Sequence, residues 1–190
     1  ITGATAVSAF IGLTASYDAT NAYLNVARTR SFASAGNTVN QIHAASGADN
    51  AGNGAMYTAI AYLPDNASAQ YAFDQVSGEI HASLRGATLE DSRFIREAMI
   101  NRTVGSPTPG KGLFFHAYGS WGSFDGDGNA ANVKRDIGGF FIGGEMVNDS
   151  GLILGALAGY GEAKIKVSDR NSKADTADTQ LGGYVGFNAL

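Results

Sequence analysis

The sequence contains no cysteine and only three prolines among its 190 residues. Disulfide bonds and cysteine-ligated metal sites are therefore excluded, although the absence of cysteine does not by itself assign a redox compartment. No run of about 18 apolar residues occurs, which excludes a transmembrane helix. A membrane role then remains open only through strands, whose signal in a sequence is much fainter.

Charged residues are also scarce, at 16% of the chain, and the formal net charge is -4 at pH 7. The excess of acids and the lack of a basic, aromatic patch argue against nucleic acid as a partner. The chain begins at Ile1 without a methionine, a basic n-region or an apolar h-region, so we expect it to be a segment of a longer protein. Glycine, in contrast, is abundant, with 26 residues.

The most informative stretch runs from Leu113 to Leu190, where apolar and polar residues alternate in four successive runs. Alternation with a period of two is typical of strands with one apolar face, and four consecutive runs predict an antiparallel meander. We expect long polar connections over residues 125–136 and 168–178, and a short turn over Asn148–Gly151. This alternation of long and short connections is typical of outer-membrane barrels.

In such a barrel one face of each strand contacts lipid and the other faces the lumen. The apolar residues of the four runs are predicted to face lipid: Leu113, Phe115, Trp121, Phe140, Ile142, Leu157, Val185 and Phe187. The residues that alternate with them are predicted to face the lumen: His116, Tyr118, Gly139, Gly143, Glu145 and Tyr160.

Four glycines fall on the predicted lumen faces: Gly139, Gly143, Gly182 and Gly186. Because they lack side chains, they are expected to leave room for a helix to pack close to the wall. A bulky replacement such as Gly143→Phe is then expected to impair barrel assembly or export.

The residues before Leu113 are of three kinds. Residues 1 to about 30 contain two or three short alternating runs, which we expect to complete a larger β-structure upstream. Residues 31–54 are rich in Ala, Ser, Gly and Asn and predict a linker with one short helical segment near 38–45. From Asp65, apolar residues at spacings of three and four predict a helix that continues to Leu84.

A second helix is predicted over residues 89–101, with Thr88 and Asp91 as a capping box. Its apolar stripe is narrow, so it is either a solvated surface helix or a helix inside a water-filled pore. It cannot lie in hydrocarbon, because each charge near the midplane costs roughly 2.5 to 3.5 kcal/mol. Since the first strand follows directly, a helix that threads the pore is the simplest route. The residues assigned to this pore helix are Leu89, Arg93, Arg96 and Glu97, and the last three are expected to meet the wall.

Several short motifs occur in an order that is known from one family. Ahead of the strands stand Ser77–Ser83, Asp91-Ser92-Arg93 and Asn101-Arg102, and within the strands stand Tyr118–Gly122, Gly138–Phe140, Gly143-Gly144, Gly155 and Gly159-Tyr160. Near the start stand Ile1–Gly3, Ser16–Asp18 and Thr38–Gln41. Together these motifs resemble the autotransporters, the type V secretion proteins of Gram-negative bacteria, over nearly the whole chain.

The resemblance implies a mainly β fold: the first four or so strands of a twelve-stranded transmembrane barrel, preceded by a helical linker and short β-helix-type strands. It divides the chain into the end of a passenger (1–35), a helical translocation linker (36–112) and the first part of the barrel (113–190). It implies a translocator that anchors in the bacterial outer membrane and carries its own passenger to the cell surface. The implied partners are membrane lipid, the barrel-assembly machinery and the passenger.

The chain departs from the family in supplying only about four strands. Four strands cannot close into a barrel. An open sheet edge in lipid leaves the N–H and C=O groups of the edge strand without hydrogen-bond partners.

The candidate chemical motifs are all incomplete. Gly105–Gly112 nearly matches a phosphate-binding loop but ends in glycine where a hydroxyl is needed. Asp125–Asn129 resembles the start of a calcium loop, but Ala130 and Asp136 replace the required glycine and glutamate. The histidines, His43, His81 and His116, lack the spacing of metal ligands, and Ser83 lies two residues from His81, on a different helix face.

We therefore predict no catalytic residues, no metal site and no cofactor in this segment. An enzymatic activity would belong to a passenger outside it. The main alternative is a soluble β-rich adhesin or fibre module in which the apolar strand faces pack against each other.

Overall fold

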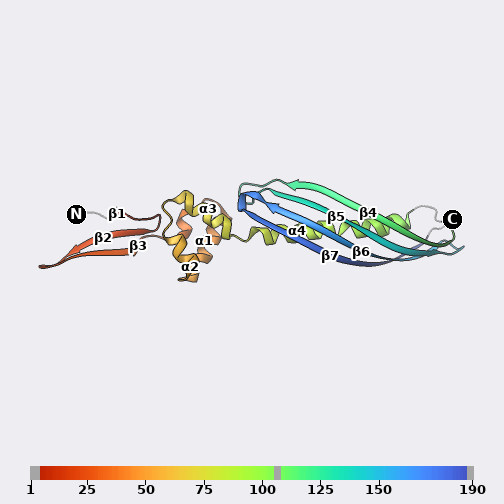
Figure 1. Cartoon of the computed structure of the whole chain (residues 1–190), viewed down its shortest axis with the longest axis horizontal. Coiled ribbons are helices and arrows are strands. Elements are labelled where there is room, and N and C mark those ends of the chain that lie inside the picture. Colours follow the sequence, from red (N-terminus) through yellow and green to blue (C-terminus); the bar gives the residue numbers. More distant parts are fainter. Residues whose placement is uncertain (1–4, 105–107, 188–190) are drawn as a thin grey trace. The chain divides into compact units, whose positions relative to one another are not determined.

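The computed structural model describes residues 5–104 and 108–187, which form two units (Figure 1). The first unit extends to Glu79 and includes Gly126–Ala131. The second comprises Ile80–Asp125 and the residues from Asn132 onward. The sequence-based division placed its boundaries after residues 35 and 112.

The first unit begins with three antiparallel strands in the order β1 (Thr5–Ala6), β2 (Ile11–Tyr17) and β3 (Ala22–Arg28). A tight turn at residues 18–21 joins the last two. The carboxylate of Asp18 accepts hydrogen bonds from the backbone N–H groups of Thr20 and Asn21, at 2.8 and 2.7 Å. These bonds and one from the Tyr23 hydroxyl hold the pKa of Asp18 far below its usual value.

Helices follow where a linker with one short helical segment near 38–45 was predicted. That segment is present and extends to Ala51, but the rest of the stretch is not the plain linker that was predicted. The elements are the 3₁₀ helix η1 (Phe32–Ala35), α1 (Val39–Ala51), α2 (Ala55–Ala61) and α3 (Asn66–Val76). Three phenylalanines, Phe10, Phe32 and Phe73, are completely buried at their centre, and alanines of α1 and α3 pack around them. The side that α1 buries carries alanine rather than large apolar residues, so residues 39–51 show no wide apolar stripe.

Strands and helices of this unit share one core. The rings of Phe10 and Phe32 meet edge to face at 4.8 Å, and the Arg28 guanidinium lies 4.5 Å above the Phe32 ring. Arg28 also forms an ion pair with Asp49 at 2.6 Å, which joins β3 to α1.

The start of α1 carries a complete capping box. The Thr38 hydroxyl accepts the Gln41 backbone N–H at 3.2 Å, and the Gln41 side-chain oxygen accepts the Thr38 N–H at 3.3 Å. Thr38→Ala is expected to destabilise α1 by about 1 kcal/mol, because one helix N–H loses its partner. Hydrogen exchange of the α1 amides in the full chain measures the effect. Ser46→Ala, an exposed position in the same helix, is the control, and equal exchange rates for the two variants would contradict the capping role.

The second unit begins at the second residue of α4 (Glu79–Asp91), and α5 (Arg93–Thr103) follows after Ser92. The single helix predicted from Asp65 to Leu84 is interrupted, because Gly78 has a φ of 69°, the left-handed conformation that ends helices. The predicted cap at Thr88 was also wrong, since this residue lies inside α4 and its hydroxyl donates to the Leu84 carbonyl at 2.9 Å. Among the described helices, none is both long enough and apolar enough to cross a membrane.

Four long strands form the sheet of the second unit: β4 (Gly110–Phe124), β5 (Val133–Val147), β6 (Leu152–Val167) and β7 (Ser172–Phe187). They pair antiparallel in sequence order, as the predicted meander requires, and the sheet formed by the described strands is open. A long connection was predicted over 168–178. The connection is instead short, made of η2 (Ser168–Arg170) and Asn171, and β7 already begins at Ser172. Polar residues occupy both faces of β7 before Asp178, so the sequence carried no strand signal there.

Candidate functional site: the helix on the concave face of the sheet

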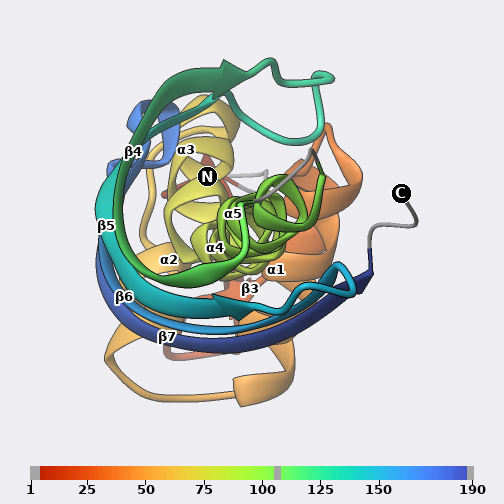
Figure 2. The same cartoon turned by 90° about the vertical axis from the view of Figure 1, so that its right-hand side faces the viewer.

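The sheet of the second unit curves around α4 and α5, which lie along its concave face (Figure 2). The contact centres on Ala98 of α5, Phe141 of β5 and Leu157 of β6, which are all buried. The Phe94 ring stacks on Tyr118 at 4.8 Å, and Tyr118 in turn stacks on Phe141 at 4.9 Å. The helix therefore packs on the sheet through aromatic and small apolar side chains.

The side of the helix that contacts the sheet differs from the prediction. Contacts come from the narrow apolar stripe: Phe94, Ile95, Ala98 and Met99. Arg93 instead pairs with Glu90 on the helix itself at 3.2 Å, and Arg96 donates to the Ser92 hydroxyl at 2.5 Å. Glu97 and Leu89 are exposed. Arg96 also lines a cavity with Gly183–Val185 of β7, and the expectation that Arg93 and Glu97 meet the wall stays a prediction.

Two of the four singled-out glycines lie beside the helix. A Cβ atom on Gly182 would lie 2.7 Å from the Met99 sulfur, and one on Gly186 would lie 2.9 Å from the Thr103 Cβ. The other two, Gly139 and Gly143, are covered by the rings of Tyr118 and Phe114 from the neighbouring strand. These two glycines therefore make room for aromatic side chains within the sheet rather than for the helix.

A buried ion pair joins the end of α4 to β5. An Arg135 guanidinium nitrogen lies 2.7 Å from a carboxylate oxygen of Asp91. Arg135 is only 4% exposed, and its guanidinium lies 6.0 Å from the centre of the Phe124 ring. Neither residue had been assigned to the site. The sequence pattern that could have indicated Arg135 is its alternation with Val133 and Ile137, which places it on the inward face of its strand.

A second charged cluster joins the end of α5 to the other end of β5. Arg102 forms a two-point ion pair with Glu145, and its Nε donates to one carboxylate oxygen at 3.0 Å. The Tyr184 hydroxyl donates to the same oxygen at 2.7 Å, and the Arg102 guanidinium lies 4.6 Å above the Phe114 ring. Glu145 therefore lies on the concave face, together with the predicted lumen residues His116, Tyr118, Gly139 and Gly143.

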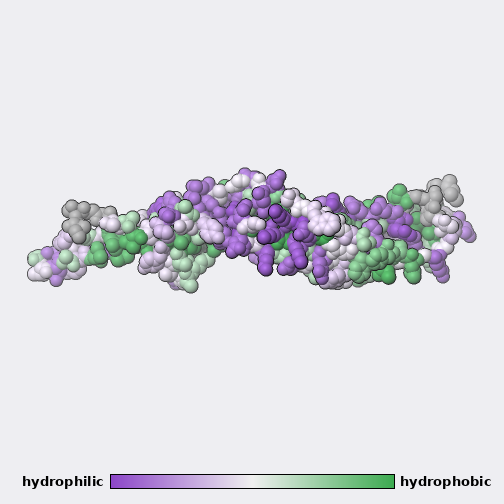
Figure 3. All heavy atoms as spheres, turned by 45° about the horizontal axis from the view of Figure 1, so that its top comes forward, coloured by the Kyte–Doolittle hydropathy of each residue, from purple (hydrophilic) through white to green (hydrophobic). Residues whose placement is uncertain are grey.

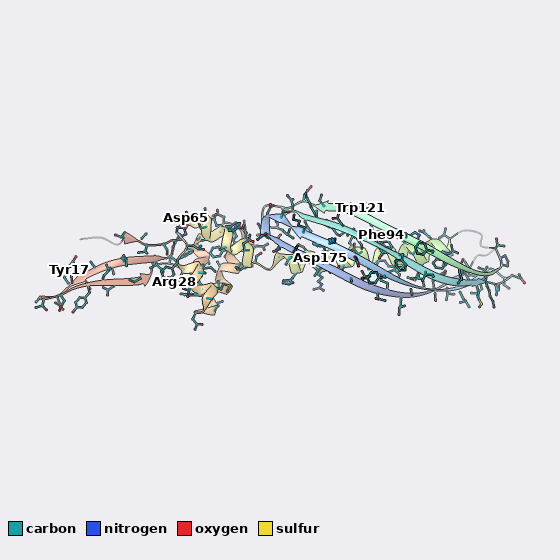
Figure 4. The ribbon with its side chains drawn as sticks, viewed as in Figure 1. Tyr17, Arg28, Asp65, Phe94, Trp121 and Asp175 are labelled. Atoms are coloured by element: carbon teal, nitrogen blue, oxygen red, sulfur yellow. The ribbon has the colours of Figure 1, made fainter. Side chains whose placement is uncertain are left out.

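The convex face of the sheet carries large exposed apolar side chains (Figure 3). The exposed fractions reach 89% for Leu113, 79% for Trp121 and 79% for Leu181. Figure 4 labels Trp121 on β4 and Phe94 on the helix that the concave face holds. Seven of the eight residues predicted to face lipid lie on the convex face: Leu113, Phe115, Trp121, Phe140, Ile142, Val185 and Phe187.

Strand β6 has the opposite orientation from the predicted one. Leu157 is buried on the concave face, whereas Tyr160 is exposed on the convex face and donates to Glu162 at 3.0 Å. Both faces of β6 carry apolar residues, with Ile153 and Leu157 inward and Leu154 and Tyr160 outward, so the rule that the more apolar face points outward failed there.

The candidate chemical motifs do not form sites in the described part of the chain. No group of three or more His, Asp or Glu side chains is arranged to hold a metal ion among the described residues. The Asp127 carboxylate accepts the backbone N–H groups of Ala130 and Asn129 at 2.7 and 2.9 Å, which lowers its pKa and closes a turn. The glycine-rich stretch that resembles a phosphate-binding loop lies partly at residues 105–107, outside the described residues.

Comparison with known proteins bears on the four strands of the second unit. Residues 113–189 match the model of a family described as the autotransporter beta-domain. This segment belongs to an autotransporter beta-domain. The family implies an outer-membrane β-barrel translocator of the type V secretion class, which is not catalytic.

One relative is similar over a longer part of the chain. An extracellular serine protease of Serratia marcescens is 29% identical over 126 residues, which cover 60% of this chain and 12% of that protein. The chain thus corresponds to about an eighth of the length of this relative. No solved structure gave a significant match.

Proposed function

We propose that the second unit forms part of the wall of an outer-membrane barrel, with α4 and α5 in its lumen, and that it anchors the protein and carries its passenger outward. The observation that supports this most is the exposed apolar convex face. A patch of this extent on a soluble domain is an aggregation liability, whereas acyl chains would cover it. Lipid and the barrel-assembly machinery are the partners that this role requires.

The extent of the apolar face fits the thickness of a membrane. On β4 the large convex residues run from Leu113 to Trp121, about 26 Å along the strand. At the tilt of barrel strands, about 35–45°, this span covers about 20 Å of the apolar band of outer-membrane proteins, which is about 25 Å tall. Toward the β4–β5 and β6–β7 connections the convex face turns polar, with Lys134 and Asp136 on β5 and Lys164 and Lys166 on β6. These connections then extend outside the hydrocarbon.

Aromatic residues lie where the apolar and polar parts of the convex face meet. Trp121 of β4 is the register partner of Asp136, and Tyr160 of β6 is the register partner of Phe140. Tyr160 contacts Glu162 through its hydroxyl and leaves its ring on the apolar side. Trp and Tyr girdles at this level mark the interfaces of membrane barrels.

Replacing Ile142 with arginine tests the lipid contact. Ile142 is 56% exposed in the middle of the convex apolar face, and a charge near the bilayer midplane costs about 2–4 kcal/mol. Ile142→Arg is therefore expected to reduce the amount of folded, membrane-inserted protein by roughly 30-fold or more. The control is Asp136→Arg on the same strand and face. Equal insertion of the two variants would contradict lipid contact and favour the soluble adhesin or fibre module.

Passenger export has a separate test. In cells that express the full-length protein, external protease is expected to digest the passenger while the helix and strands of the second unit stay protected. A passenger that resists external protease in intact cells, although the barrel is inserted, would contradict the translocation role and leave the anchor role standing.

A further inference from the structure

Two ion pairs of opposite polarity link the helix to a single strand. Asp91 of the helix meets Arg135 near the start of β5, and Arg102 of the helix meets Glu145 near its end. On the helix the two charges lie eleven residues apart, about 16 Å. On β5 they lie ten residues apart, about 33 Å along the strand. The two separations can still match, because the strand is inclined to the helix and because a long arginine side chain bridges the remaining distance at each end.

The polarity of the pairs distinguishes the two directions in which the helix can run. In the observed direction each acid meets an arginine. In the reverse direction Arg102 would meet Arg135, and Asp91 would meet Glu145. Burying like charges against each other is unfavourable, and Arg135 is buried.

The sequence also distinguishes the observed register from its neighbours. A shift by one helical turn moves the chain by three or four residues. No such shift brings another charged residue opposite Arg135 or Glu145. After such a shift the residue opposite Arg135 would be Ala87, Thr88, Phe94 or Ile95 in place of Asp91. The residue opposite Glu145 would be Ala98, Met99, Gly105 or Ser106 in place of Arg102.

We infer that β5 specifies the direction and register of the lumen helix through these two pairs, and that Asp91, Arg135, Arg102 and Glu145 are positioning residues. The apolar stripe of α5 supplies the contact area, but small apolar residues tolerate sliding. The charges select one arrangement, as a buried polar residue selects register in a coiled coil. The inference rests on the proposed function only in calling the enclosed space a lumen.

A disulfide between the helix and β7 reports the register, because the chain has no native cysteine. A Cβ on Gly186 would lie 2.9 Å from the Thr103 Cβ, so cysteines at these positions need to separate by less than about 1 Å to reach disulfide geometry. Thr103→Cys with Gly186→Cys reports the observed register. Met99→Cys with Gly186→Cys reports a slip by one turn. Both are tested in the full-length protein in outer membranes, and the readout does not depend on export.

The observed-register disulfide is expected to form in the otherwise unchanged protein. Adding Glu145→Arg, or Arg102→Glu, is expected to reduce it about fivefold or more, and combining the two is expected to restore it to within about twofold. Exchanging the charges of Asp91 and Arg135 follows the same rule. The control is Glu97→Arg, which reverses an exposed charge on the same helix, and it is expected to have no effect.

Each possible result either supports or overturns the inference. The inference is supported if each single charge reversal lowers the yield of the observed-register disulfide and the combined exchange restores it. Formation of the Met99→Cys and Gly186→Cys disulfide in the single reversals supports it further. Unchanged disulfide yield in the reversals, failure of the exchange to restore it, or absence of the observed-register disulfide in the parent would each overturn the inference. Because export is measured separately, none of these results bears on the translocation role.

Discussion

Gly143→Phe is expected to prevent the second unit from forming its sheet. A Cβ at this position would lie 2.6 Å from the carbonyl oxygen of Ala156 on β6 and would also overlap the Phe114 ring. The ring has room to turn, but the carbonyl belongs to the paired strand and cannot move without breaking the β5–β6 ladder. A full benzyl group adds further overlap, so we expect a loss of about 3 kcal/mol or more in the free energy of unfolding, together with loss of surface display.

Gly138→Phe is the matched control for this prediction. Gly138 lies on the same strand but on the convex face, where a Cβ would meet only the Tyr118 carbonyl oxygen at 3.9 Å. Folding into lipid vesicles, followed by urea unfolding, measures the difference between the two variants. Similar stability for both would show that the concave face is not packed as described.

Asp91→Asn is expected to lower the free energy of unfolding of the second unit by about 3–5 kcal/mol. The substitution keeps the size of the side chain but removes the charge that Arg135 faces at 2.7 Å. The guanidinium would then remain buried beside the Phe124 ring without a counter-ion, because its exposed fraction is only 4%. An uncompensated buried charge is the costly part of such a change, rather than the lost attraction itself.

Two further variants separate this effect from a general loss of charge. Glu90→Gln removes an adjacent acid whose pair with Arg93 is solvent-exposed, and it is expected to cost less than about 0.5 kcal/mol. The double variant Asp91→Leu with Arg135→Met removes both buried charges and is expected to recover most of the stability. Equal unfolding midpoints for Asp91→Asn and Glu90→Gln would contradict the buried pair.

The strand alternation predicted the faces of β4 and β7 because each has one clearly apolar side. Strand β5 is apolar on both sides, with Phe141 buried on the concave face and Phe140 and Ile142 exposed on the convex face, as predicted. On β4 the residues Leu113, Phe115 and Trp121 point one way and His116 and Tyr118 the other, as the period of two requires. On β6 the same rule failed. Apolar residues stand on both sides, and only the position of the helix decides that Leu157 points inward.

The helical part was harder to predict for two physical reasons. The side that α1 buries is formed by small alanines, so its packing depends on close contact rather than on a wide apolar stripe. At Gly78 the sequence alone could not distinguish a tolerated glycine within a helix from a break. The structure shows the break, because the φ of this residue is 69°.

The charged contacts of the helix could be predicted only in part. The exposed pair of Glu90 and Arg93 follows from spacing along one helix, and the structure contains it. The pairs of Asp91 with Arg135 and of Arg102 with Glu145 join residues more than 40 positions apart. Their partners are fixed by the register of the helix on the sheet, which no local pattern encodes.

The contact between the convex face and acyl chains is tested most directly by labelling single cysteines with a fluorophore in the protein reconstituted in vesicles. Ile142→Cys and Val185→Cys occupy exposed convex positions, and Gln180→Cys occupies the concave face. Brominated acyl chains are predicted to quench the labels at 142 and 185 strongly and the label at 180 weakly. Equal, weak quenching at all three positions would show that the convex face is covered by protein or water instead of lipid.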